Sequence, residues 1–135
     1  MSGKSNYFED AILNWAKGSA MPTAPTGLYV GLFNGDPTDA GTGGTEVTTT
    51  VRTAGRVAAT FGTVTVNAGA DTIANTGAVD FGNAAAGATF THFAVFDAAS
   101  AGHILWSNAL TGGTQTVSAG TDVSFAVGAL VISED

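Results

Sequence analysis

The stretch that decides the fold is Gly27-Leu-Tyr-Val-Gly-Leu-Phe33, in which apolar side chains alternate between two faces. One face holds Leu28, Val30 and Leu32, and the other holds Tyr29 and Phe33. A period of two residues is the period of a β-strand, because successive side chains of a strand point to opposite sides. Residues 27–33 are therefore predicted to form a strand.

The segment before this strand has the period of a helix instead. Its apolar residues recur at spacings of three and four and form one stripe, which consists of Tyr7, Phe8, Ala11, Ile12 and Trp15. Ser5 or Asn6 can cap the first turn, and Gly18 is placed to end the last one. Pro22 and Pro25 then forbid a helical continuation. One N-terminal helix is predicted.

After residue 34 the chain alternates between short strand-like segments and clusters of turn-forming residues. The expected strands cover residues 47–52, 55–61, 63–67, 71–75, 78–81, 89–96, 103–110, 114–117 and 122–132. This spacing predicts an all-β protein, an antiparallel β-sandwich or jelly roll of about eight strands preceded by one N-terminal α-helix. Residues 1–26 are expected to form the helix and linker, and residues 27–135 the sandwich domain. The expected core consists of Leu28, Val30, Leu32, Phe61, Phe81, Phe93, Val95, Leu105, Phe125 and Leu130.

Charge excludes several classes of partner. The 135 residues include 4 Lys and Arg against 11 Asp and Glu, so the net charge is −7. All four cations lie within the first 56 residues. A surface so poor in cations cannot neutralise phosphates, and anionic membranes would repel it, so neither nucleic acid nor membrane is an expected partner. The sequence has no cysteine, so it offers neither a disulfide nor a thiolate metal site and does not indicate a redox compartment. It has no signal peptide and no apolar run long enough to span a bilayer, which predicts synthesis in a cytoplasm.

Candidate catalytic and metal-binding residues are few. His92 and His103 flank a predicted hairpin, but no third ligand lies at a spacing typical of metal sites. Asp36, Asp39 and Glu46 share a glycine-rich loop whose spacing does not match a calcium-binding loop, and turn formation explains the two aspartates. We therefore expect no enzyme activity, no cofactor, no metal and no small-molecule substrate.

Three other features have two interpretations each. The aromatic residues either fill the core or form a sugar-binding platform, which makes a carbohydrate-binding module an alternative. One or both of Arg52 and Arg56 either pair with an acid across a subunit contact or form a solvated or intramolecular ion pair that contributes little. The stripe of Tyr7, Phe8, Ile12 and Trp15 either folds back onto its own domain or docks on a neighbour.

The loop of residues 34–45 holds nearly every turn-forming residue type and no large apolar side chain. Such a loop has nothing to bury. We expect it to be exposed, and either mobile or ordered only by a neighbouring molecule.

Several blocks together resemble a family of small phage structural proteins, often labelled tail fibre proteins and associated also with head decoration. The blocks are Asn6–Trp15, Leu28–Glu46 with its Leu-Tyr-Val-Gly-Leu-Phe and Asp-Pro-Thr-Asp-Ala-Gly motifs, Thr91–Asp97, Leu105-Trp106 and Val123–Leu130. The resemblance covers nearly the whole chain, in order. It implies a non-enzymatic structural protein of the virion, with no catalytic residues to transfer.

Within the virion, the sequence favours decoration of the capsid over a place in the tail. A fibre shaft needs long repeats, and this chain has none. We therefore expect a cement protein that binds the major capsid protein or other virion proteins as a homo-oligomer. A tail or tail-fibre component involved in host attachment is the alternative. The expected interaction residues are Tyr7, Phe8, Ile12, Trp15, Arg52 and Arg56.

Overall fold

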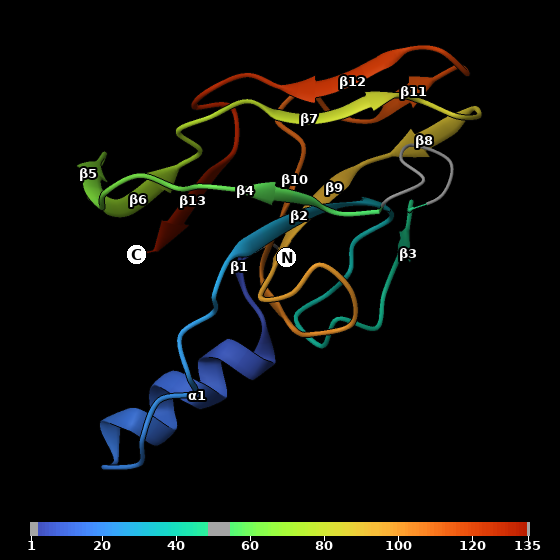
Figure 1. The fold of residues 1–135 in the computed structure, drawn as a ribbon. Helices are drawn as coiled ribbons and strands as arrows, with labels where there is room; N and C mark the ends of the chain where they lie inside the picture. The colour runs from blue at the N-terminus through green and yellow to red at the C-terminus, as the bar shows by residue number, and fades with distance from the viewer. Residues whose placement is uncertain (1–2, 49–54, 135) are drawn as a thin grey trace.

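The computed structural model describes residues 3–48 and 55–134. Within these ranges the chain forms thirteen short strands and one α-helix, and every strand pair is antiparallel (Figure 1). The elements are β1 (Gly3–Lys4), α1 (Asn6–Ala16), β2 (Leu28–Asn34), β3 (Thr45–Glu46), β4 (Val57–Ala59), β5 (Thr65–Asn67), β6 (Ala70–Ala74), β7 (Val79–Asn83), β8 (Ala88–Phe90), β9 (His92–Phe96), β10 (Ile104–Ala109), β11 (Gln115–Val117), β12 (Asp122–Phe125) and β13 (Val131–Glu134). The predicted all-β class is confirmed.

The main sheet is built around β2, as the sequence predicts. Its strands run in the order β1-β10-β9-β2-β3, and β4 pairs with the other half of β2. Alternation along β2 separates two apolar clusters. Val30 and Leu32 belong to the large core on one face of the sheet, whereas Phe33, with Tyr29 packed beside it, belongs to a smaller cluster on the other face.

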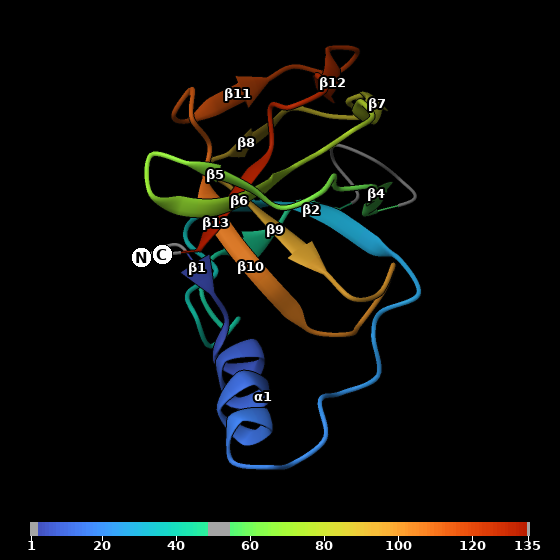
Figure 2. The same ribbon diagram turned by 90° about the vertical axis from the view of Figure 1, so that its left-hand side faces the viewer.

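A second layer covers the large core. In both ribbon views the pairs β7–β12 and β8–β11 lie on one side of the main sheet and α1 lies on the opposite side (Figures 1 and 2). Val79, Phe81 and Val123 of this layer pack with the main sheet, and Leu130 and Ile132 join them. Of the predicted core, the buried members are Val30, Leu32, Phe81, Phe93, Val95, Leu105 and Leu130. Leu28, Phe61 and Phe125 are partly buried against the core.

Several strands are shorter than expected because the chain changes partner within them. The expected strand 89–96 is divided at Thr91: β8 pairs with β11, whereas β9 pairs with β2 and β10. The expected strand 122–132 is divided likewise into β12, which pairs with β7, and β13, which pairs with β6. A two-residue strand also precedes the helix. The expected strand 47–52 lies in part outside the described residues.

Of the two candidate caps for helix α1, the structure uses Ser5. The backbone N–H of Phe8 donates to Oγ of Ser5, which is almost fully buried, and Lys17 follows as the C-cap. Ser5 also fixes the helix to the sheet, because its hydroxyl donates to the carbonyl of Ile104 and its N–H donates to the carbonyl of Leu105 over 2.9 Å. The start of α1 is thereby joined to β10. No helix in the described ranges is long and apolar enough to span a membrane.

Substitution of Ser5 by alanine should lower the free energy of unfolding by about 1–2 kcal/mol, since a helix cap and a buried hydroxyl donor are lost together. Urea unfolding followed by circular dichroism measures the change. The control is Ser19→Ala, at an exposed position beyond the helix. An equal effect of both substitutions would contradict the anchoring role of Ser5.

Candidate functional site

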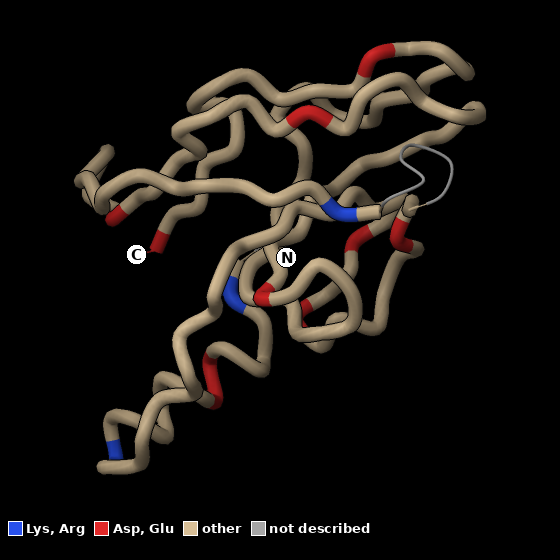
Figure 3. Tube along the Cα trace, viewed as in Figure 1, with Lys and Arg blue, Asp and Glu red and all other residues tan. Residues whose placement is uncertain are grey.

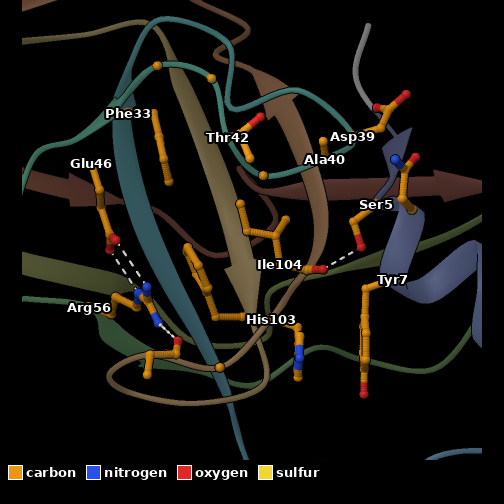
Figure 4. Close-up of a pocket in the computed structure, with 17 residues that line it drawn as sticks. Ser5, Tyr7, Phe33, Asp39, Ala40, Thr42, Glu46, Arg56, His103 and Ile104 are labelled. Carbon is orange, nitrogen blue, oxygen red and sulfur yellow. Dashed lines mark hydrogen bonds and ion pairs between the residues drawn. The ribbon is translucent and has the colours of Figure 1, made fainter.

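A cleft of about 460 Å³ opens on the face of the main sheet opposite the large core (Figure 4). Its walls come from the start of α1, the loop between β2 and β3, and the turn between β9 and β10. Figure 4 shows Glu46 and Arg56 on one side of it and Ser5, Tyr7 and His103 on the other. This cleft is the first candidate site, and the N-terminal helix is the second.

The floor of the cleft shows why β2 carries a glycine in its middle. A Cβ atom at Gly31 would lie 2.8 Å from Oε1 of Glu46 and 3.0 Å from the ring of Phe96. The missing side chain therefore makes room for an ion pair to lie across the strand. Glu46 accepts from Arg56 twice, with Nε–Oε1 at 2.8 Å and Nη2–Oε2 at 3.0 Å.

Arg56 makes two further hydrogen bonds within the chain. Its Nη1 donates to the carbonyls of Ala98 at 3.0 Å and Ala101 at 2.6 Å, in the turn after β9. The guanidinium lies over the ring of Phe96, 3.3 Å from its centre, and only 9% of the side chain is exposed. Arg56 thus joins β3, β4 and the β9–β10 turn. Its partners are intramolecular, and any contact with another subunit stays a prediction.

The loop of residues 34–45 is more firmly attached than the sequence suggests. Pro37 is fully buried, and the carbonyl of Asp39 accepts from the N–H of Asn6 over 2.8 Å. The N–H of Thr38 donates to Oδ1 of Asp36 over 2.8 Å, and this bond lowers the pKa of that carboxyl. The expectation that the loop has nothing to bury was wrong, because the apolar ring of Pro37 is buried. Its mobility stays a prediction.

Tyr7 and His103 form one rim of the cleft. Their rings stack with centroids 3.8 Å apart, and Nδ1 of His103 lies 3.1 Å from Oδ2 of Asp97. His92 stands at the opposite end of the β9–β10 hairpin, where it pairs in register with Ala109 and contacts Thr91. The two histidines considered as a metal pair are therefore held apart.

The charged side chains of the cleft are bonded to neighbouring parts of the chain and brace its walls. Among residues 3–48 and 55–134, no three His, Asp or Glu side chains are grouped closely enough to hold a metal ion. Glu46 is occupied by Arg56, and His103 by Asp97 and Tyr7. One face of each rim ring is covered by the other ring, so Tyr7 and His103 offer no joint flat platform for a sugar. The carbohydrate-binding alternative is untested.

The expected interaction residues fall into three environments. Tyr7 stacks on His103 and Phe8 meets Trp106 edge to face at 4.9 Å, so the first turns of α1 rest on the domain. Ile12 is half-buried and Trp15 is 61% exposed. Arg56 lies in the cleft, and Arg52 lies outside the described residues. Whether these residues mediate interactions stays a prediction.

Charge is spread unevenly over the surface. Acidic positions occur on both layers and in the segment between β2 and β3, and basic positions are few (Figure 3). Of the described cations, Lys4 pairs with Glu134 and Arg56 pairs with Glu46, while Lys17 is exposed at the end of α1. Glu134 also accepts from the indole N–H of Trp106 over 2.6 Å, which ties the last strand to β10.

The fold and these two sites define a class: a small, layered β protein with an internally braced cleft and a projecting helix that carries exposed apolar side chains. The family model described as Podophage GP4 fiber I protein gp80 matches residues 3–133. The chain belongs to this family, which confirms the resemblance to small phage structural proteins and makes it a fibre-like component of the virion. A comparison with curated proteins gives no match.

Proposed function

We propose that this protein is a structural component of a phage tail fibre and works by binding other virion proteins, without catalysing a reaction. The observation that carries the proposal is the match to a fibre family over residues 3–133. The cleft supports it, because the charged groups of Glu46 and Arg56 are bonded to each other and to backbone carbonyls and are not left to act on a substrate.

Capsid decoration, which the sequence favoured, stays a prediction. No feature of the described residues distinguishes binding to a head shell from binding to a tail. The family description points to the fibre, and for this reason we rank the tail first and the head second.

Deletion of the gene from the phage separates these possibilities. We expect particles with heads of normal heat resistance that adsorb poorly to host cells, and restored adsorption when the protein is supplied from a plasmid. Particles that adsorb normally but burst at a lower temperature than the parent phage would contradict the fibre assignment and support capsid decoration.

A further inference from the structure

The apolar stripe of α1 continues beyond the edge of the domain. Its first part is covered, since Phe8 packs on Trp106 and Ala11 is buried. Trp15 lies seven residues after Phe8 and thus on the same side of the helix, yet 61% of it is exposed. Leu13 is 66% exposed and Met21, in the segment that returns from the helix, is 42% exposed. We call α1 with this returning segment, residues 6–27, the arm; it projects from the sheets in both ribbon views (Figures 1 and 2).

Few packing contacts stabilise the outer end of the arm. A helix of 11 residues is shorter than the roughly 12–15 residues at which isolated helices become even marginally stable in water, so packing must supply its stability. The outer turn of α1 lacks such packing within the described chain, and its exposed side chains include a tryptophan. Tryptophan is among the residues that most often anchor protein interfaces.

The base of the same arm contains a groove of about 270 Å³. Aromatic and aliphatic side chains form much of its lining, which comprises Tyr7, Phe8, Leu105, the Pro22–Pro25 segment and Asp97. This volume is below the roughly 300–1,000 Å³ of pockets that hold drug-sized ligands, and suits a few apolar side chains. The arm therefore carries an exposed apolar projection at its tip and an apolar groove at its base.

Charge favours a second copy of the chain as the occupant of this groove. Two α1 helices packed antiparallel bring the tip of each arm to the base of the other. Lys17, the single cation of the arm, then approaches the exposed acidic first turns of the partner helix at Glu9 and Asp10. The acid that lines the groove, Asp97, adds to this complementarity. Two chains of net charge −7 repel each other elsewhere, so a patch with both signs is where they associate most favourably.

We infer that the arm is a self-association surface, in which Trp15 of one copy enters the groove beside Phe8 of a second copy and the second copy does the same in return. This two-fold arrangement uses the same patch on both chains. It does not depend on whether the protein resides in the fibre or on the capsid, because it concerns only contacts between copies.

Sedimentation equilibrium of the purified full chain tests the inference. We expect the wild type to form dimers or larger even-numbered assemblies, and Trp15→Glu to weaken association by about 30-fold or more, as loss of an interface anchor does. The matched control is Val66→Glu, which places the same charge at a residue of β5 that is 76% exposed, and should associate as the wild type does. Circular dichroism checks that both variants are folded.

Cross-linking gives a second readout, in which the inference predicts the appearance of a covalent dimer and not a loss of association. The chain contains no cysteine, so single cysteines can be introduced cleanly. Ala16→Cys keeps Trp15 and places a thiol at the exposed position beside it. Mixed with Thr23→Cys it should form a mixed disulfide dimer under mild oxidation, and mixed with Asn83→Cys it should not. A monomeric wild type, an unchanged assembly of Trp15→Glu, or equal cross-linking in both mixtures would overturn the inference.

Discussion

Replacement of Asn75 by alanine should lower the free energy of unfolding by about 3 kcal/mol, because three hydrogen bonds of a buried amide are lost at once. The side chain is 2% exposed. Its Nδ2 donates to the carbonyls of Gly77 at 2.8 Å and Ala126 at 2.9 Å, and its Oδ1 accepts from the N–H of Leu130 at 2.8 Å. The turn after β6 and the turn between β12 and β13 are thus held together by one residue, and without it the buried N–H of Leu130 loses its partner.

Chemical denaturation of Asn75→Ala measures this effect, with Asn83→Ala as the control at an exposed position in β7. We expect the control to change stability by less than about 0.5 kcal/mol. Asn75→Asp keeps the acceptor for Leu130 but loses both donated bonds, so it too should be strongly destabilised. A loss of under about 1 kcal/mol in Asn75→Ala would show that the turns are held by other contacts.

Substitution of Arg56 by methionine should also cost about 3 kcal/mol, since removal of one member of a largely buried ion pair leaves the other without compensation. Only 9% of the Arg56 side chain and 22% of the Glu46 side chain are exposed. The substitution also removes the donor to the carbonyls of Ala98 and Ala101, so the turn after β9 should loosen. Thermal unfolding gives the stability, and hydrogen exchange of residues 97–103 reports the turn.

The matched control is Lys17→Met, which removes the same charge from an exposed position at the end of α1. We expect it to leave the stability of the domain nearly unchanged. A double-mutant cycle with Glu46→Gln should show that the two substitutions are not additive, because both remove the same pair. Additive losses would mean that Arg56 acts through contacts other than Glu46.

Local patterns in the sequence predicted the helix and strands that are determined by apolar periodicity and by capping. The alternation in residues 28–33 predicted both faces of β2, and the spacing of Tyr7, Phe8 and Ala11 predicted α1 with Ser5 as a possible cap. Most of the expected core is indeed buried. It could be predicted because alternate residues of a strand lie on opposite faces, so the apolar ones mark the face that is buried.

Features of the fold that depend on contacts between residues far apart in the sequence could not be predicted. The division of strands at Thr91 and after β12 follows from a change of partner sheet, which no local pattern records. Strand β1 has two residues and no periodicity. The partner of Arg56 is Glu46, ten residues earlier in the sequence. The one local hint was a glycine at position 31, in a strand where a side chain is otherwise expected.

The place of the protein in the particle is the central claim, and immunogold labelling of intact virions tests it most directly. Antibodies raised against the purified chain would be applied to phage particles and viewed by electron microscopy, with a phage that lacks the gene as the control for specificity. We expect gold particles at the tail, where fibres attach. Gold spread over the surface of the head, with none at the tail, would contradict the fibre assignment.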